Sequence, residues 1–210
     1  MEEFLFHAYA FAKEWQTLLG ALIALCAAVW TIGVMRRQAK NEERRHQDQI
    51  SRRELAMRAQ MPDALAAVSV YAKNVGDYVL GLDSQLPQEP SIAISSLKQV
   101  IEHIQIDAAQ RTFELVSWYQ VQRARLEDYS TQPRVYQRSD LLYDGILLHA
   151  HACSLFEYAR NEATNVSTER PSFEEMQSSL RQAVDLEFRA RKNPQLEKLD
   201  ALIKQRHHSS

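Results

Sequence analysis

The chain has 210 residues, a formal net charge of −2 and 45% hydrophobic residues. Its five glycines leave little room for the frequent turns of a β fold, and its basic and acidic residues nearly balance. The composition therefore argues against an all-β protein. The charge distribution argues against a nucleic-acid-binding protein, because the only basic cluster, at residues 36–58, directly follows a long uncharged run that could lie in a membrane.

The first feature along the chain is an uncharged run that follows a short leader at residues 1–14. The run covers residues 15–35, WQTLLGALIALCAAVWTIGVM. At about 1.5 Å per residue it is long enough to cross a bilayer core of about 30 Å. The alternatives are a buried core helix and a cleaved signal peptide. Core helices are usually shorter, and the leader carries Glu2, Glu3 and Glu14 against Lys13 alone, so we expect a transmembrane helix.

The residues after this run predict its orientation. Between positions 36 and 58 there are eight basic residues and four acidic ones. Basic residues next to a span stay on the cytoplasmic side, so we expect the leader outside and the body inside, with anionic lipid headgroups at the membrane surface as a partner. The residues expected at the membrane interface are Trp15, Arg36, Arg37, Lys40, Arg44 and Arg45.

One side of the span carries small residues at spacings of four, three and four. Such a stripe lets two helices approach closely, which makes it a candidate face for dimerisation, although spans are rich in Gly and Ala in any case. The stripe consists of Gly20, Ala24, Ala27 and Thr31. Cys26 lies inside the span and Cys153 far beyond it, so they cannot pair within one chain, which fits a reducing compartment for the body.

Residues 36–61 predict a juxtamembrane stalk helix, because they contain helix-favouring residues and neither Gly nor Pro. The composition is coiled-coil-like, but the heptad seam positions are polar, for example Gln38, Asn41 and Arg45. Acid-first pairs four residues apart, such as Glu54 with Arg58, suit an exposed helix. We therefore expect a solvated spacer that ends near Pro62.

Residues 62–206 predict a cytosolic domain, which completes an all-α fold with a bundle of about five to six helices. The first helix carries apolar residues at spacings of three and four and ends at Gly81, before a loop at residues 85–90. A second begins near Ser91, and we favour a break near Asp107, which would cap a third helix, over one continuous helix. The expected buried residues of these helices are Leu65, Val68, Ala72, Val75, Val79, Leu82, Leu97, Val100, Ile101, Ile104, Phe113, Val116, Tyr119 and Leu126.

After a loop at residues 129–139, Ser139 is expected to cap the most buried helix, in which Gly145 and Ala152 allow close packing. Ser172 and Glu175 have the spacing of a capping box, and Asn193-Pro194 predicts the start of the last helix before a tail at residues 207–210. The expected buried residues are Leu141, Leu148, Leu155, Ala159, Met176, Leu180, Val184, Phe188, Leu196, Leu199 and Ile203.

Two polar groups invite a chemical interpretation. His149, His151 and Cys153 contain metal-binding side chains, but residues two apart on a helix point about 200° apart, so only His149 and Cys153 share a face. Glu157 extends that face. His103 with Glu102 and Asp107 has the residues of an acid–base group, although a surface pair is the simpler interpretation.

The sequence therefore predicts no catalytic, cofactor-binding or metal site. The numerous aromatic residues of the body have helical spacing, which favours core packing over a ligand cage. They are Tyr71, Tyr78, Trp118, Tyr119, Tyr136, Tyr143 and Tyr158.

Three segments of the first eighty residues carry a resemblance. They are EWQTLLGALIALCAAVWT, MRRQAKNEERRHQDQISRRELAMRAQ and DALAAVSVYAKNVGDYV. They resemble a loose group of small, uncharacterised single-span bacterial inner-membrane proteins with a helical cytosolic domain. The resemblance implies a bacterial inner-membrane setting and no particular activity or site residue.

The sequence leads to two functional hypotheses. The first is a non-enzymatic, membrane-anchored helical module that binds a protein partner, with self-association as one form. The alternative is a membrane-bound effector, either an enzyme with an unrecognised site or a membrane-disturbing factor in conflict with phage.

Overall fold

The computed structural model describes residues 2–132, 137–184 and 194–207, and every regular element within them is a helix. The all-α prediction is therefore confirmed. The chain divides into two compact units, Met1–Ser51 and Arg52–Ser210. This boundary differs from the predicted domain boundary at residue 62, because the end of the stalk belongs to the body.

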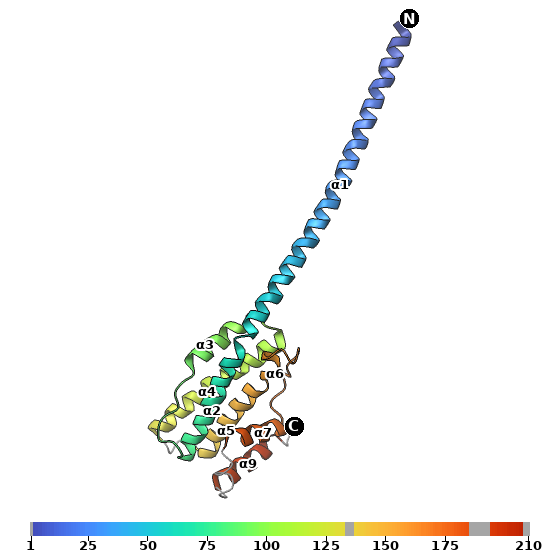
Figure 1. Cartoon of the computed structure of the whole chain (residues 1–210). Coiled ribbons are helices and arrows are strands. Elements are labelled where there is room, and N and C mark those ends of the chain that lie inside the picture. Colours follow the sequence, from blue (N-terminus) through green and yellow to red (C-terminus); the bar gives the residue numbers. More distant parts are fainter. Residues whose placement is uncertain (1, 133–136, 185–193, 208–210) are drawn as a thin grey trace. The chain divides into compact units, whose positions relative to one another are not determined.

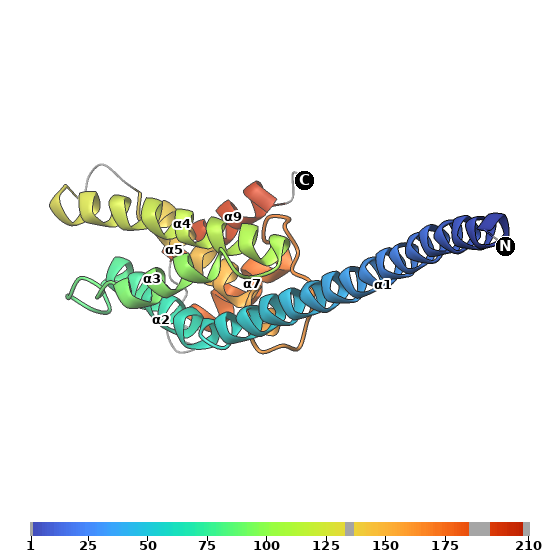
Figure 2. The same cartoon turned by 90° about the horizontal axis from the view of Figure 1, so that it is seen from above.

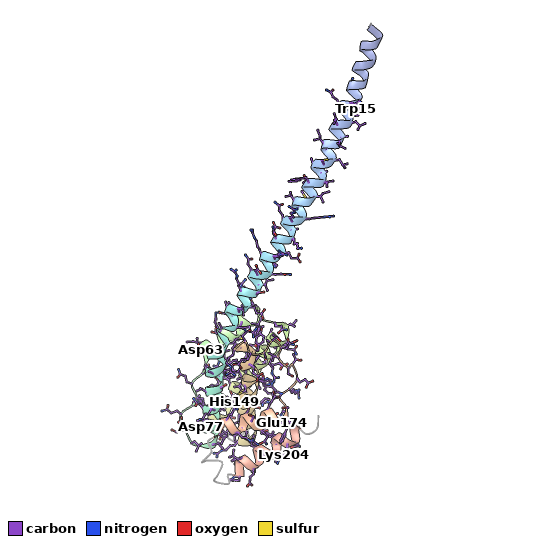
Figure 3. The ribbon with its side chains drawn as sticks, turned by 45° about the vertical axis from the view of Figure 1, so that its right-hand side comes forward. Trp15, Asp63, Asp77, His149, Glu174 and Lys204 are labelled. Carbon is purple, nitrogen blue, oxygen red and sulfur yellow. The ribbon has the colours of Figure 1, made fainter. Side chains whose placement is uncertain are left out.

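The first unit is part of one long helix, α1 (Glu2–Arg58), which is drawn in blue in Figure 1. The helix continues from the uncharged run into the stalk without a break. All side chains described between residues 18 and 53 are exposed, and Figure 3 shows them projecting on every side of the helix.

The second unit contains the end of α1 and, after the turn at residues 59–60, a helical bundle (Figure 1). The predicted break at Pro62 is confirmed, with Pro62 in the first turn of the next helix, where its missing N–H has no partner to lose. The helices are α2 (Met61–Leu80), α3 (Ser91–Val100), α4 (Ile106–Thr131), α5 (Arg138–Cys153), α6 (Phe156–Ala159), α7 (Phe173–Ala183) and α9 (Pro194–His207).

The centre of the bundle is α5, which contacts α2, α4, α7 and α9. Every residue from Leu141 to Ala152 is buried, so the prediction of a deeply buried helix here is confirmed. Gly145 faces α2, where a Cβ atom would lie 3.5 Å from the Ala72 carbonyl oxygen and 3.6 Å from Val75 Cγ1. Figure 2 shows α3 beside α2 and α4, which it also contacts.

Several helix ends lie where the sequence predicts them. Gly81 ends α2 with a φ of 78°, and Leu82 beyond it is exposed, so its predicted burial is wrong. The capping box of α7 is formed, with Ser172 N donating to Glu175 Oε2 at 2.6 Å and Glu175 N donating to Ser172 Oγ at 3.2 Å. The predicted break near Asp107 is also present, because α3 ends at Val100.

Two predicted N-caps are wrong. Gln105 occupies the N-cap position of α4, so Asp107 lies in the first turn, where its charge suits the positive end of the helix dipole. Gln137 occupies the N-cap position of α5, so Ser139 is a buried residue inside the helix. In both cases an extended glutamine backbone starts the helix two residues earlier than the polar side chain suggests.

Phe113 is also predicted wrongly, because 61% of its surface is exposed. A step of three residues falls short of one full helical turn. Phe113 therefore points further away from Tyr119 than from Val116, and its side chain leaves the buried face that those two residues share. The helix predicted to include Leu155 and Ala159 ends earlier, since α5 stops at Cys153 and α6 follows a turn, although both residues are buried. Tyr136, Phe188 and Asn193 lie outside the described residues.

The close approach of α5 to α2 gives a stability prediction. Gly145→Ala places a methyl group at ordinary contact distance and adds helix propensity, so it should raise the free energy of unfolding by up to about 1 kcal/mol. Gly145→Leu should lower it by about 1 to 3 kcal/mol, since the longer side chain meets the α2 backbone. Denaturant unfolding of the full chain in detergent measures both, and a Leu variant as stable as the Ala variant would contradict the packing.

Candidate functional site

The uncharged run of α1 has the properties that a membrane span requires. An 18-residue window has a mean hydropathy of 2.3, and none of it is buried. A buried core helix, the first alternative considered above, does not fit this exposure. Among the predicted interface residues, Trp15 is half exposed at 52%, and Arg36, Arg37, Lys40, Arg44 and Arg45 are exposed. The helix is thus long and apolar enough to cross a membrane.

The candidate dimer face is open along its length. Gly20, Ala24, Ala27 and Thr31 are all exposed, and no atom lies within 4 Å of a Cβ built on Gly20. The Thr31 hydroxyl donates to the Ala27 carbonyl oxygen at 2.7 Å, so its polar atom is satisfied inside the helix. A neighbouring helix could therefore meet this stripe without finding an unpaired hydroxyl.

Arg58 fixes the last turn of α1 within the body. The side chain is buried, and its Nε donates to the Tyr158 carbonyl oxygen at 3.1 Å while Nη2 donates to the Ala163 carbonyl oxygen at the same distance. The guanidinium also stacks on the Tyr158 ring at 3.9 Å. These contacts hold the segment after α6 against the end of α1.

Tyr158 joins this cluster to a third element. Its hydroxyl donates to Glu54 Oε1 at 3.1 Å and accepts from the backbone N–H of Gln105 at 3.2 Å. Glu54 lies 3.9 Å from Arg58, as their spacing predicts. The end of α1, the start of α4 and α6 therefore meet at one tyrosine, a meeting point that no sequence spacing indicates.

Two further buried charges are missing from the sequence predictions. Arg111 is 1% exposed, and it donates to Ser154 Oγ at 3.0 Å and to the Glu169 carbonyl oxygen at 2.7 Å. Asp144 is 2% exposed and accepts from Arg125 Nη1 at 2.6 Å. Apart from Glu114, which lies 3.4 Å from Arg111 at a spacing of three, these partners lie 19 or more residues away in sequence, so a local pattern could not reveal them. Both buried charged side chains link helices or loops to the core.

The structure brings His149 and Cys153 together on α5, as predicted, and the labelled His149 lies within the bundle in Figure 3. Cys153 Sγ lies 3.4 Å from His149 Nδ1 and 3.7 Å from Gln182 Oε1. Burial raises the pKa of the Cys153 thiol and lowers the pKa of His149. Both groups are therefore neutral near pH 7, unlike the thiolate and imidazolium of a cysteine nucleophile.

The thiol borders a cavity of about 250 Å³ between α5 and α7, with Glu157 and Glu175 at its edge. His151 lies elsewhere, buried near Arg111. Within the described residues, no three His, Cys, Asp or Glu side chains are grouped so as to hold a metal ion. The geometry gives this cluster a packing role.

His103 and Glu102 line a separate hollow of about 400 Å³, whose lining includes Lys98 and Met57 but not Asp107. The three residues of the candidate acid–base group are thus not gathered around one space. The hollow offers charges of both signs and the hydroxyl of Ser95, but it does not bring the predicted acid–base group together.

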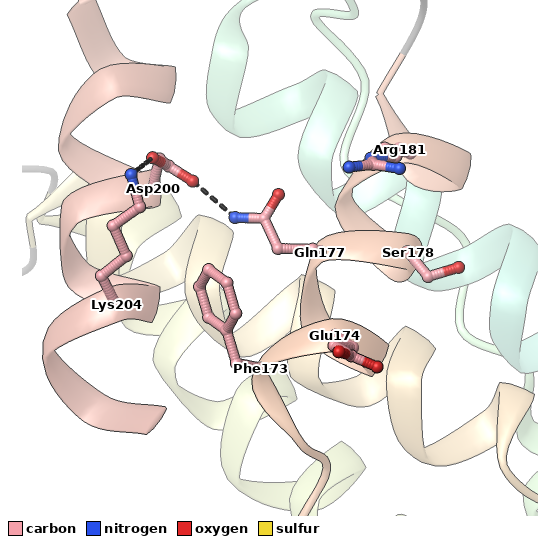
Figure 4. A pocket seen from close by; sticks show the side chains of 7 residues that line it. All are labelled: Phe173, Glu174, Gln177, Ser178, Arg181, Asp200 and Lys204. Carbon is pink, nitrogen blue, oxygen red and sulfur yellow. Dashed lines mark hydrogen bonds and ion pairs between the residues drawn. The ribbon is translucent and has the colours of Figure 1, made fainter. Parts of the chain in front are cut away.

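A groove of about 580 Å³ lies between α7 and α9 (Figure 4). Asp200 holds its polar side, accepting from Gln177 Nε2 at 2.5 Å and pairing with Lys204 Nζ at 2.7 Å. The hydrogen bond from Lys204 lowers the pKa of Asp200. Glu174 and Arg181 also line the groove, so its charges are mixed and favour no single ligand class.

The aromatic residues of the body belong to its core and core edge. Tyr71 and Tyr119 are buried and meet edge to face with ring centroids 5.4 Å apart, and the Tyr71 hydroxyl donates to Gln122 Oε1 at 3.0 Å. Tyr143 and Tyr158 are buried, and Tyr78 and Trp118 are half-buried. The favoured interpretation, core packing, is confirmed for these six residues.

Comparison with protein-family models, with curated proteins and with solved structures finds no match for this chain.

The Arg58 cluster gives a second stability prediction. Arg58→Gln removes the charged hydrogen bonds to the carbonyl oxygens of Tyr158 and Ala163 and the stacking on Tyr158, so it should lower the free energy of unfolding of the body by about 2 to 3 kcal/mol. Arg53→Gln removes an exposed charge one turn earlier and should change it by less than about 0.5 kcal/mol. Urea titration of the full chain in detergent compares them, and equal effects would contradict the role of Arg58.

Buried His151 gives a prediction about pH. Burial, with a smaller contribution from the Arg111 charge, lowers the pKa of His151 from 6.5 to about 3. Below pH 6.5 the unfolded chain binds a proton that the folded chain does not, so stability falls as the pH falls, by about 1.4 kcal/mol per pH unit. His151→Gln should show a shallower fall of unfolding free energy between about pH 6 and 5. A slope equal to that of the wild type would contradict the burial of a neutral imidazole.

Proposed function

We propose that this protein is a single-span anchor that holds a helical body at the cytoplasmic face of a bacterial inner membrane, where the body binds a protein partner. One observation carries the proposal: the uncharged run of α1 is apolar on all sides and exposed on all sides. A helix that is hydrophobic all round is stable when lipid surrounds it.

The charges that follow the run support the orientation. Five exposed cations, Arg36, Arg37, Lys40, Arg44 and Arg45, occupy the three turns after residue 35. Each attracts an anionic membrane surface by about 1 kcal/mol, and such residues resist transfer across the bilayer. The charged stalk then acts as a solvated spacer between the headgroups and the body.

The body supports a binding role through its exposed apolar side chains. Ile92 on α3 and Ile106 and Phe113 on α4 are exposed by 84%, 79% and 61%. Ile106 and Phe113 are two turns apart and share a side of α4. Apolar side chains of this size on an ordered helix surface suit contact with another protein, including a second copy of this chain.

We rank the alternative function, a membrane-bound effector, below the membrane anchor. An enzyme would need an activated group, and the thiol of Cys153 is held in its neutral form by burial. A membrane-disturbing factor would use the same span, so we separate it from an anchor by whether the span alone harms the cell.

Insertion is tested by placing charge in the span. Leu22→Arg with Val29→Arg should release the protein from carbonate-washed membranes, because each arginine near the centre of a span costs about 3 kcal/mol of insertion free energy. Ile50→Arg with Leu55→Arg makes the same change at exposed apolar positions of the stalk and should leave the protein in the membrane pellet.

Orientation is tested on intact spheroplasts with protease added from outside. The body should stay whole until the membrane is permeabilised. Cleavage of the body from outside, or recovery of the wild-type chain in the carbonate wash, would contradict the proposed function.

A further inference from the structure

The surface of α1 contains a groove near the cytoplasmic end of the span. It has a volume of about 430 Å³ and forms where Gly33 leaves a gap between larger side chains. No atom lies within 4 Å of a Cβ built on Gly33, so the gap is open. The lining residues are Leu25, Cys26, Val29, Trp30, Gly33, Val34 and Arg37.

The groove has the length of a lipid chain in one leaflet. The twelve residue steps from Leu25 to Arg37 rise about 18 Å along the helix. Half of a bilayer core is about 15 Å thick. A groove of this length runs from near the middle of the bilayer to the headgroup level.

One end of the groove is charged and the remainder is not. Cys26, Trp30, Gly33 and Arg37 follow spacings of four, three and four, so they share one side of α1 and Arg37 stands at its polar end. Arg36 is next in sequence but lies about 100° around the helix and does not line the groove. A guanidinium at this position can bind a phosphate oxygen pair.

We propose that this groove binds one anionic phospholipid, with an acyl chain along Leu25 to Val34 and the headgroup phosphate at Arg37. The inference rests on the proposed function, because it requires the span to lie in a bilayer. It goes further than the proposed function because it assigns a lipid-selective site to one side of the helix and to one arginine. General electrostatic attraction would instead involve all the basic residues of the stalk.

A thin chain suits this groove better than a second helix does. Close helix packing needs small residues over several turns, and here Leu25, Trp30 and Val34 hold a second backbone away. The small stripe from Gly20 to Thr31 lies on a different side of α1 and offers the closer approach. The positive charge of Arg37 complements an anionic headgroup.

The experiment uses Trp30 as the reporter, in the full chain carrying Trp15→Phe and Trp118→Phe. The protein is reconstituted in vesicles of equal parts phosphatidylcholine and phosphatidylglycerol, with either one or the other lipid brominated. Bromine quenches tryptophan fluorescence at short range, so the ratio of the two quenching efficiencies reports which lipid occupies the groove. We expect phosphatidylglycerol to quench more strongly.

Matched variants separate the site from general attraction. Arg37→Gln should lower the preference for phosphatidylglycerol about fivefold, the effect of one cation near the membrane surface. Arg36→Gln removes the same charge outside the groove and should lower it by a clearly smaller factor. Gly33→Leu fills the groove and should also lower it, whereas Gly20→Leu adds the same side chain elsewhere on the span and should not.

The outcomes distinguish this inference from the proposed function. Quenching by neither lipid means that the span is not in the bilayer, and the proposed function fails with the inference. Equal quenching by both lipids, equal effects of Arg36→Gln and Arg37→Gln, or no effect of Gly33→Leu overturns the lipid site and leaves the anchor intact.

A second copy in the groove is tested separately through Cys26, in a Cys153→Ser background. A Cys26 disulfide that forms between chains in the vesicles and is lost in Gly33→Leu would mean that another span occupies the groove, which overturns the proposal. Absence of this crosslink supports the lipid, whereas a crosslink that Gly33→Leu leaves unchanged also places a second span at Cys26 in the groove and overturns the proposal.

Discussion

The structure depends on one constraint, which is that the apolar surface of α1 must be removed from water. Burial of one large aliphatic or aromatic side chain contributes about 2 kcal/mol, and the run from Trp15 to Met35 contains many such side chains on every side of the helix. The described side chains of this run are exposed. A partner helix would cover one stripe, whereas lipid covers the whole circumference. The uncharged run is therefore the basis of the proposed membrane location, and the basic residues after it are the basis of the proposed orientation.

The body is held together in part by buried charges, one of which, Arg58, lies in the last turn of α1. Arg58, Arg111 and Asp144 are buried charges, and each is paired with carbonyl oxygens or with an opposite charge. A buried charge is costly without partners, so these groups specify one arrangement of the segments that they join. Arg58 and Tyr158 hold α6 and the residues after it at the end of α1, and Gly145 lets α5 pack closely on α2. The result is an ordered scaffold whose described polar clusters serve packing.

The sequence predicts the fold wherever local physical chemistry decides it. Gly81 and the Ser172–Glu175 capping box act within one helix end, and the helix ends are correct there. Prediction is wrong at Phe113, because α4 places Arg111 and Gln122 inside and turns apolar residues outward, against the usual polarity. Arg111 bonds to Ser154 and Glu169, and Gln122 bonds to Tyr71, all of which lie outside α4. The groove at Gly33 could not be predicted from the sequence either, because a glycine in a span indicates a gap only when the positions of the larger side chains around it are known.

Amide hydrogen exchange of the full chain in lipid bilayers tests the central claim most directly. If lipid surrounds the uncharged run, the backbone amides of residues 18–35 should exchange far more slowly than those of the exposed stalk at residues 38–52, although both belong to the same continuous helix. Water is excluded from the first segment and surrounds the second. Exchange at similar rates in the two segments would show that the run is not in the bilayer, and the account of this protein as a membrane anchor would be wrong.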